Sequence, residues 1–336
     1  MEKERKKKIK KITLITTIVI LAFYLIGGIL ASFIVNNTIF QGSTTSLDLL
    51  NQYPNTVFKT RDDYPLLANR IEHQFKSGNN TLYGYYYDVN DEKGLVISAH
   101  GINNLADGSN AQMHNYFVSL GYDVFAIDLT GSGRSEGRST VSLSQSVIDI
   151  KNAYQYLKNN ALLKDNLILM GHSWGAYGVT MASSEIEANK VIAFSTFNRP
   201  IDLMFDMAED AAGFLAYLTY PTFIVGNLLQ YGTNPFKKAN AVIKKKDETQ
   251  FLIIQGDKDN LLPYEDTLYH KTLGYQNVTS LLLNDIGHDY PWLDLSAVTY
   301  INSLDKETKK EDVDLEKSSQ ISPLVDLAIR QFLNED

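Results

Sequence analysis

A serine between two glycines is the part of the sequence with the clearest capacity for chemistry. It is Ser173 in Gly171-His172-Ser173-Trp174-Gly175, with an apolar run at 166–170 before it and a helix-compatible composition at 176–184 after it. Where a strand turns sharply into a helix, a serine at the turn projects above the sheet, and the free amides of the helix can face a developing oxyanion. Such a turn leaves no space for a Cβ on either side. Ser173 is therefore a candidate nucleophile, provided that a base removes its proton.

A second stretch, Gly133-Arg134-Ser135-Glu136-Gly137, has the same pattern in a different context. It lies several residues past a predicted strand at 122–129, inside a glycine-rich loop, and no helix is expected directly after it. The carboxylate of Glu136 would also repel a developing oxyanion. We therefore interpret Ser135 as structural. The missing helix argues equally against a dinucleotide site in this loop.

The histidine that follows the last predicted strand is the best candidate for the base. His288 lies in the loop 285–289 directly after an apolar strand at 278–283, which places it at the same edge of a parallel sheet as Ser173. His172 adjoins the serine and is expected to point away from its hydroxyl. The remaining histidines are His73, His100, His114 and His270, of which the last two fall inside predicted helices.

Two aspartates after the preceding predicted strand, 251–255, could orient that histidine. Asp257 and Asp259 lie in one loop, and either could reach a histidine in the adjacent loop. Asp259 is further from the hydrogen-bonded end of the strand and has more freedom to turn inward, but both remain candidates on this argument. Asp285 and Asp289 are weaker candidates because they are too close in sequence to His288 to orient its far nitrogen easily.

The elements that must position these residues alternate along the chain. An opening hairpin is predicted at 70–75 and 81–87, followed by strands at 94–99, 122–129, 166–171, 190–195, 251–255 and 278–283. Helices are predicted at about 109–120, 141–158, 174–186, 263–273 and 319–334. This alternation is typical of an α/β fold with a mostly parallel sheet covered by helices on both faces.

Two segments interrupt the alternation. Residues 198–247 contain no clear strand but are rich in aromatic, methionine and leucine residues, and we expect a helical lid over the site. Residues 303–319 carry charges of both signs and are interpreted as a solvated excursion without chemistry.

From about residue 70 to residue 336, the chain resembles the α/β-hydrolase superfamily, in particular its lidded serine hydrolases similar to monoacylglycerol lipases, lysophospholipases and serine aminopeptidases. The motifs that carry the resemblance are His100-Gly101, Asp128 to Gly137, the nucleophile elbow at Ser173, and Gly256-x-x-Asp259-x-x-Leu262-Pro263 before Gly287-His288. The order serine, aspartate, histidine is also that of this superfamily.

The resemblance implies roles for particular residues. It makes Asp259 the acid of a Ser173-Asp259-His288 catalytic triad, and it assigns the oxyanion hole to the backbone amides of Ile102 and Trp174. The sequence departs from common relatives at Ala176, where a second glycine is frequent, and in the unusually polar segment 102–108. No metal or organic cofactor is implied.

Charge is divided unevenly along the chain. Seven Lys or Arg and two Glu give residues 1–11 a charge of +5, which leaves −13 on the remainder. An acidic body argues against a nucleic-acid partner. Cysteine is absent, which excludes disulfides and thiolate chemistry.

The N-terminal region predicts a membrane anchor. Residues 12–35 carry no charge and exceed the roughly 20 residues that span a bilayer. The basic residues 1–11 are expected to stay cytoplasmic, which places the catalytic domain outside the cell membrane. A cleavable signal peptide is less consistent with this length, so we favour an uncleaved, single-pass signal anchor. Gly28 and Ser32 form a small-xxx-small face that could pair helices. Residues 36–69 are interpreted as a stalk, and residues 70–336 as the hydrolase domain.

Three functions follow as expectations. The first is a lipase-like hydrolase acting on the carboxylic ester of an acyl lipid or small molecule. The second is a peptidase or amidase of the same fold, because Ser173-Trp174-Gly175 resembles the elbow of prolyl aminopeptidases. The third is a non-catalytic binding protein, which an intact triad disfavours. No obligate protein partner is evident in the sequence.

Overall fold

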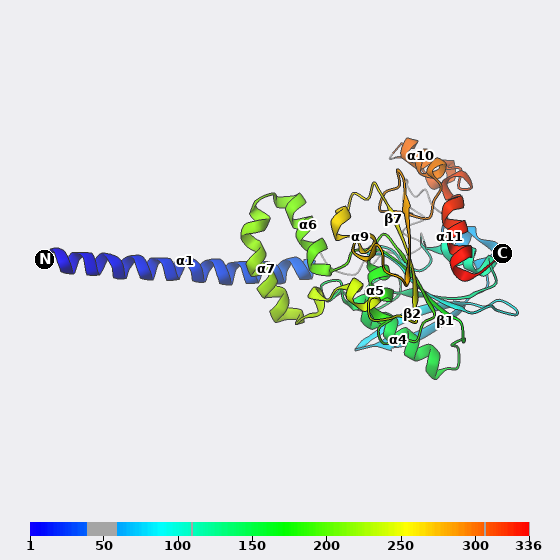
Figure 1. The fold of residues 1–336 in the computed structure, drawn as a ribbon, viewed down its shortest axis with the longest axis horizontal. Coiled ribbons are helices and arrows are strands. Elements are labelled where there is room, and N and C mark those ends of the chain that lie inside the picture. The colour runs from blue at the N-terminus through cyan, green and yellow to red at the C-terminus, as the bar shows by residue number, and fades with distance from the viewer. Residues whose placement is uncertain (39–58, 109, 306, 336) are drawn as a thin grey trace.

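One eight-stranded sheet lies at the centre of the body of the molecule (Figure 1). The computed structural model describes residues 1–38, 59–108, 110–305 and 307–335. The strand order is β1-β2-β4-β3-β5-β6-β7-β8. β2 pairs antiparallel with both β1 and β4, and every pair from β4 through β3 to β8 is parallel. The predicted mostly parallel α/β fold is confirmed.

Each predicted strand is present, with ends that differ by one or two residues. The bounds are β1 Ile71–Ser77, β2 Asn80–Tyr87, β3 Leu95–Ala99, β4 Asp123–Asp128, β5 Leu167–His172, β6 Lys190–Phe194, β7 Gln250–Gly256 and β8 Val278–Leu283. The central strands are apolar throughout because both of their faces are buried. In β5, for example, Leu167 and Leu169 face one hydrophobic core while Ile168 and Met170 face the other.

Helices cover both faces of the sheet. One face carries α4 Gln145–Asn159, α5 Trp174–Ala182, α8 Ala239–Ile243 and α9 Leu268–Thr272, and the other carries α3 Ala111–Ser119, α10 Leu295–Ser303 and α11 Pro323–Leu333. The body therefore has three layers, with a separate apolar core on each side of the sheet.

Some predicted helix bounds were wrong, and one helix was not predicted. The helix expected from residue 141 begins at Gln145, because Val141, Ser142 and Leu143 adopt left-handed backbone conformations with φ of 48°, 53° and 64°. The region 263–273 divides into a short 3-10 turn, Tyr264–Asp266, and α9. Helix α10 was missed, since a single residue, Ala297, is fully buried along it and its apolar pattern is weak.

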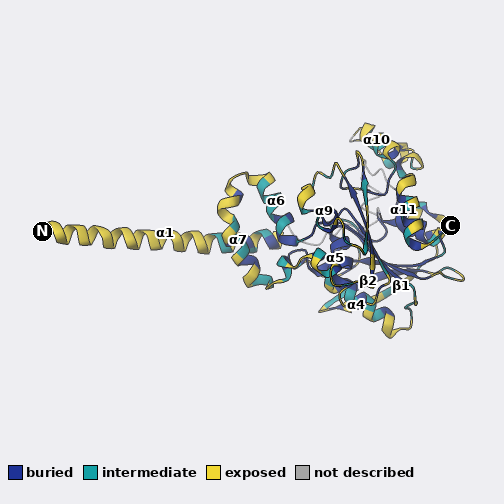
Figure 2. Ribbon diagram, viewed as in Figure 1, coloured by how far each residue is buried: buried dark blue, intermediate teal, exposed yellow. Residues whose placement is uncertain are grey.

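Helices α6 Pro200–Ala212 and α7 Leu215–Tyr231 form a hairpin outside the three layers. Helix α1, Glu2–Thr38, projects from the body, and in Figure 1 its C-terminal part passes beside this hairpin. Among the described residues, α1 is the one helix that is long and apolar enough to cross a membrane. Figure 2 shows that the residues in the N-terminal part of α1 are exposed.

After α1 the described chain resumes at Lys59, which is buried in the body ahead of the sheet. Of the predicted stalk, residues 39–58 lie outside the described residues. Two 3-10 turns, Arg61–Asp63 and Pro65–Leu67, follow, and Leu67 is fully buried. The charged excursion 303–319 packs beside them, where the Lys310 ammonium group donates to the Asp63 carboxylate at 2.7 Å. This ion pair therefore stabilises the two turns that precede β1.

Burial lowers the pKa of three histidines in the body. It lowers the pKa of His100 to about 4, and the pKa values of His114 and His172 to about 3. His114 lies on α3, where its Nε2 is 2.7 Å from the hydroxyl of Ser98. The folded chain thus keeps these rings neutral at pH values where the unfolded chain, with an ordinary pKa of about 6.5, protonates them.

We expect the free energy of unfolding to fall as the pH falls below about 6.5, because the unfolded state then binds protons that the folded state does not. Each ring contributes a loss of about 2 kcal/mol at pH 5. The buried carboxyl of Asp128, whose pKa burial raises to about 6, offsets about 1 kcal/mol. In urea unfolding at pH 7 and pH 5, His114→Gln should show a drop smaller than that of the wild type by about 2 kcal/mol. Equal drops would contradict this explanation.

Candidate active site

Three loops distant in sequence meet at the carboxyl edge of the sheet. β5 ends at His172 and is followed by Ser173, β7 is followed by the loop that holds Asp259, and β8 is followed by the loop that holds His288. β5, β6, β7 and β8 are neighbours in parallel, so their carboxyl ends lie side by side. Parallel pairing therefore brings these three residues to one place.

The three side chains form a continuous chain of hydrogen bonds. His288 Nε2 lies 2.9 Å from Ser173 Oγ, and His288 Nδ1 lies 2.8 Å from Asp259 Oδ2. All three side chains are almost fully buried, with Ser173 5% exposed and His288 6% exposed. The predicted serine, histidine and aspartate are thus within hydrogen-bonding reach of one another, in the arrangement that transfers a proton from a serine to an imidazole.

Ser173 occupies a strained turn between β5 and α5. Its φ of 51° and ψ of −115° lie outside the regions that L-residues ordinarily adopt. Its amide donates to the carbonyl of Phe194 at 2.9 Å, and the hydroxyl of Thr196 donates to its carbonyl at 2.9 Å. A Cβ on Gly175 would lie 2.2 Å from the carbonyl oxygen of Ala99, and one on Gly171 would lie 2.5 Å from the backbone of Gly175. The flanking glycines are needed for this close approach.

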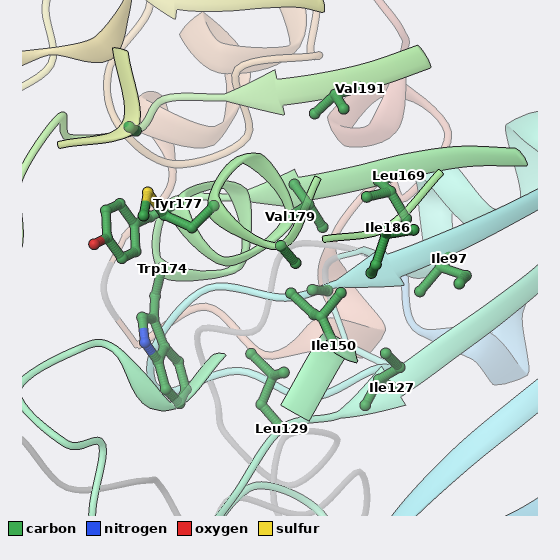
Figure 3. Close-up of a cluster of buried hydrophobic side chains, with 14 of the residues drawn as sticks. Ile97, Ile127, Leu129, Ile150, Leu169, Trp174, Tyr177, Val179, Ile186 and Val191 are labelled. Carbon is green, nitrogen blue, oxygen red and sulfur yellow. The ribbon is translucent and has the colours of Figure 1, made fainter. Parts of the chain in front are cut away.

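Helix α5 begins directly after the serine and is buried over all nine of its residues. Trp174 and Tyr177 lie on it within the hydrophobic core shown in Figure 3. The indole of Trp174 donates to the carbonyl of Leu143 at 2.9 Å. The side chain of Trp174 therefore packs, while its backbone amide stays at the start of the helix beside Ser173.

Asp259, rather than Asp257, is the aspartate that contacts the histidine. Burial by itself would raise the pKa of Asp259, but the hydrogen bond and charge of His288, the amide of Leu262 and the side chain of Gln255 together lower it. Gln255 donates to Asp259 Oδ2 at 2.7 Å. Asp257 instead accepts a hydrogen bond from the amide of Asp285 at 2.6 Å and fixes the loop before His288. The carboxylate beside the imidazole thus keeps its negative charge.

His172 contacts the loop of His288, which sequence reasoning missed. Its Nε2 lies 3.0 Å from the carbonyl oxygen of His288, and the two rings pack with centroids 5.3 Å apart. The side chain of His172 thus contacts the main chain of the His288 loop. The sequence signal for His172 was its position next to Ser173, and that position gives no information about a contact with a residue 116 positions away. The hydrogen bond from Gln255 to Asp259 was also missed, because nothing in the sequence around Gln255 indicates it.

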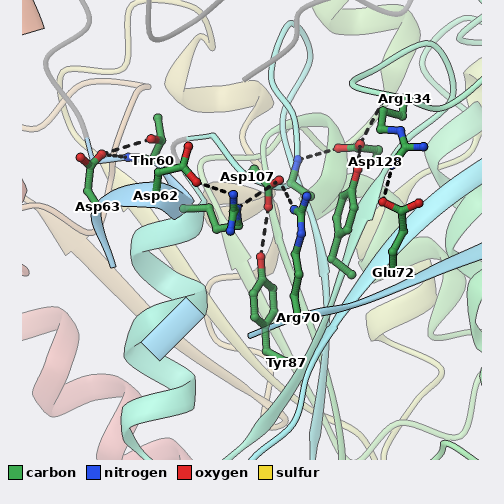
Figure 4. Close-up of polar contacts among 12 residues, drawn as sticks. Thr60, Asp62, Asp63, Arg70, Glu72, Tyr87, Asp107, Asp128 and Arg134 are labelled. Carbon is green, nitrogen blue, oxygen red and sulfur yellow. Dashed lines mark hydrogen bonds and ion pairs between the residues drawn. The ribbon is translucent and has the colours of Figure 1, made fainter. Parts of the chain in front are cut away.

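The loop that carries Ile102 is fixed by buried polar groups. His100 Nδ1 lies 2.6 Å from the carbonyl oxygen of Gly101, and the amide of Leu129 donates to His100 Nε2 at 3.1 Å. Further along, the amide of Ala106 donates to Asp128 at 2.8 Å. Figure 4 shows this region, where Asp107 also accepts hydrogen bonds from Arg70 and from the hydroxyl of Tyr87. The polar segment 102–108 is therefore held against the sheet.

A cleft of about 350 Å³ opens beside Ser173. It is lined by Gly101, Ile102, Asn103, Asn104, His172, Ser173, Leu261, His288, Asp289 and Tyr290. Asp289 thus faces the cleft but is not the partner of His288 Nδ1. A larger hollow of about 490 Å³ lies near Gln250 at the start of β7, at the opposite edge of the sheet from the serine. The smaller cleft is the one that gives a ligand access to the candidate nucleophile.

Ser135 has the structural role expected from its loop. Its hydroxyl donates to the carbonyl of Asp128 at 2.6 Å and accepts from the amide of Tyr83 at 2.9 Å. The carboxylate of Glu136 accepts from the amide of Thr81 at 2.7 Å. These contacts join the glycine-rich loop to β2, so the hydroxyl of Ser135 is already engaged.

Residues 90–230 match the family described as Serine aminopeptidase, S33. An esterase of Pyrococcus furiosus, PF2001, is similar in structure with a TM-score of 0.54 and 19% identity, over 74% of this chain and 90% of that chain. The α/β hydrolase GrgF of Penicillium sp. sh18 is similar with a TM-score of 0.52 and 17% identity, over 69% of this chain and 95% of that chain.

This chain has the α/β-hydrolase fold. The resemblance noted from its motifs is confirmed, as is the mostly parallel sheet with helices around it. No curated protein matches the sequence significantly.

Substituting Gly175 by alanine should disrupt this site. The added Cβ would meet the backbone of β3, so the strand or the start of α5 must shift, at a cost of about 1–3 kcal/mol. We expect a lower melting temperature and labelling of Ser173 by a fluorophosphonate probe that is slower by about tenfold or more. Ala176→Gly, one residue further, adds no atom and should retain labelling at a cost of about 1 kcal/mol. Unchanged labelling of Gly175→Ala would show that the contact with β3 is not needed.

Proposed function

We propose that this α/β hydrolase is a membrane-anchored serine hydrolase that cleaves a carboxylic ester through Ser173, His288 and Asp259. The observation that carries the proposal is the unbroken hydrogen-bond chain from Ser173 through His288 to Asp259, at a cleft open to a ligand. A structural serine would not need a strained turn, a buried imidazole and a buried carboxylate arranged in series.

In the first half of the reaction, Ser173 Oγ attacks the ester carbonyl carbon as His288 Nε2 takes its proton. The carbonyl π electrons move to the oxygen, and the backbone amides of Ile102 and Trp174 are proposed to stabilise the oxyanion, each donor contributing about 10²–10³-fold in rate. Asp259 holds His288 by Nδ1 and stabilises the imidazolium. Collapse of the oxyanion breaks the bond to the alcohol oxygen, which takes the proton from His288 Nε2.

In the second half, water takes the place of the alcohol. His288 Nε2 accepts a proton from the water as the water oxygen attacks the acyl-enzyme carbonyl, and the same two amides again stabilise the oxyanion. Collapse breaks the bond to Ser173 Oγ, which regains its proton from His288. The products are an alcohol, a carboxylic acid and the free enzyme, and each proton is accounted for by one imidazole.

The chemistry of the hairpin formed by α6 and α7 favours an apolar acyl substrate. We propose that this hairpin is the lid expected from residues 198–247, because its side chains are mostly aromatic or aliphatic. The second candidate is a peptidase or amidase, since the family matched by residues 90–230 is described as a serine aminopeptidase. The same triad serves both reactions, and the substrate class decides between them.

We also propose that α1 spans the cell membrane, with residues 1–11 in the cytoplasm and the hydrolase domain outside. The apolar stretch from Ile12 to Val35 is long enough for this, and the lysine-rich end precedes it. The orientation follows from that charge asymmetry.

The nucleophile can be tested against a serine in the same sequence pattern. Ser173→Ala should abolish fluorophosphonate labelling and lower p-nitrophenyl ester hydrolysis by about 10⁴-fold or more, because no other hydroxyl contacts His288 Nε2 within the described residues. Ser135→Ala should keep both activities, because Ser135 contacts only backbone groups. Labelling that persists in Ser173→Ala, or wild-type protein that is never labelled, would refute the proposed chemistry and favour a non-catalytic binding protein.

Ester and amide substrates can be compared on one preparation. A panel of p-nitrophenyl esters of increasing acyl length and of aminoacyl-p-nitroanilides should give activity on the esters, with kcat/KM rising with acyl length by about threefold per added CH₂ that is buried. Activity confined to the anilides would replace the esterase proposal with the aminopeptidase one.

A further inference from the structure

Helices α1 and α7 lie side by side and run in the same direction. Side chains of α1 make hydrogen bonds to α7 at three levels: Tyr24 to the carbonyl of Leu218, Ser32 to the carbonyl of Phe223 at 3.4 Å, and Asn36 to the side chains of Asn227 and Gln230 at 3.1 Å each. The partner residues advance together along both helices, which defines a parallel pair. α7 therefore follows the axis of the apolar helix for several turns.

Small residues let the two backbones approach closely. A Cβ on Gly28 would lie 2.2 Å from the hydroxyl oxygen of Thr222, and one on Gly226 would lie 2.5 Å from the Cβ of Ser32. Close contact of this type, with polar side chains across it, is typical of helices that pair within membranes. The small-xxx-small face formed by Gly28 and Ser32 is thus occupied by a helix of the same chain.

The same contact reaches the candidate active site. The side-chain oxygen of Asn227 accepts hydrogen bonds from Asn36 and, at 2.7 Å, from the hydroxyl of Ser142. The next residue, Leu143, accepts the indole N–H of Trp174. The hairpin is therefore held between the end of α1 on one side and the loop that contacts the nucleophile elbow on the other.

The positions of these contacts along α1 determine how deep in the membrane the hairpin lies. If α1 spans the membrane, a hydrocarbon core of about 30 Å takes up about 20 residues, from Ile12 to near residue 31. Tyr24 then lies about 10 Å below the outer edge of that core, at 1.5 Å per residue. Leu218, bonded to Tyr24, lies at the same depth, whereas Asn227 lies outside the core with Asn36.

The large side chains of the hairpin at that depth are apolar and are not buried by other described residues. At that depth and below it, the exposed large side chains of the hairpin are Phe214 (72%), Leu215 (52%), Tyr217 (57%) and Leu218 (55%). Val225 (38%), Leu228 (49%) and Leu229 (66%) continue this surface outward, beside Ser32 to Asn36 at the edge of the membrane. Figure 2 shows the exposed surface of the hairpin beside the exposed helix α1. An apolar surface that continues the surface of a transmembrane helix matches a lipid leaflet. Glu209 and Asp210 also lie near the turn between α6 and α7, at about the depth of Leu218 or below it. Carboxylates are costly within hydrocarbon, so water and local thinning of the bilayer must accompany insertion at this end of the hairpin.

We propose that the α6–α7 hairpin is inserted in the outer leaflet of the membrane, held there by parallel pairing of α7 with the anchor helix α1. The partner of its exposed face is the acyl and headgroup region of the lipids around the anchor. This inference rests on the proposed membrane-spanning role of α1, and it goes beyond that role because an anchor alone would leave the hairpin in water.

Insertion can be measured with a fluorophore placed on single cysteines, since the chain contains none of its own. The full-length protein is reconstituted in phosphatidylcholine vesicles, and NBD is attached at Leu218→Cys, Leu21→Cys or Leu324→Cys. Leu324, on α11, is 58% exposed, which matches the 55% of Leu218. Nitroxide-labelled lipids then quench any fluorophore that lies within the bilayer.

We expect NBD at Leu218 to be quenched by about twofold or more by a nitroxide on a mid-chain acyl carbon, and at Leu21 by one near the chain end, whereas Leu324 is not quenched. Quenching at Leu21 without quenching at Leu218 would overturn the inference and leave the anchor intact. Absence of quenching at Leu21 would overturn the anchor itself, and with it the inference. Neither result depends on hydrolase activity.

Helix pairing has its own test. Asn36→Cys/Asn227→Cys should form an intramolecular cross-link with a short bis-maleimide in the vesicles, because the two side chains are in contact. Ile34→Cys/Asn227→Cys serves as the control, since Ile34 is 63% exposed and lies on the other side of α1. Equal cross-linking in both variants, or none in the first, would refute parallel pairing.

Discussion

The backbone of the first turn of α5 lies directly against the carboxyl end of β3, and the candidate site depends on this contact. Gly175 approaches the carbonyl of Ala99 so closely that no side chain fits between them, and a Cβ on Gly101 would lie 3.0 Å from the imidazole of His172 and 3.4 Å from the Cβ of Ser173. The contact of Gly175 with β3 brings the loop of Ile102 next to the serine. The geometry of the candidate site is therefore set largely by main-chain packing, which is stiffer than packing through rotamers.

Most of the fold could be predicted from the sequence because its signals are local. Continuous apolar runs predicted the buried strands, and the order of loops after them placed Ser173 and His288 at one edge. Residue chemistry alone left Asp257 and Asp259 open, and the resemblance to a superfamily favoured the one that contacts His288. What could not be predicted depends on contacts between distant residues. The bond from His172 to the carbonyl of His288 spans 116 residues, and the pairing of α1 with α7 spans more than 190.

The sequence also gave no indication of the backbone strain at residues 141–143. Val141, Ser142 and Leu143 read as the start of a helix, but their left-handed backbone lets Ser142 reach Asn227 and lets Leu143 accept the indole N–H of Trp174. A β-branched residue such as Val141 adopts this conformation only when surrounding contacts demand it. The loop thus links the helical hairpin to the nucleophile elbow at the cost of a disfavoured conformation.

The distance along the chain between the members of the triad has a consequence for the time at which the protein becomes reactive. Ser173 stands 115 residues before its imidazole partner, and the helix that begins after it has no exposed residue on which to form alone. During synthesis, the hydroxyl of Ser173 is therefore made before His288 and Asp259 are present and before its turn is stable. In the proposed mechanism the base comes from the loop after the last strand, so a nascent or truncated chain without that loop would not hydrolyse an ester.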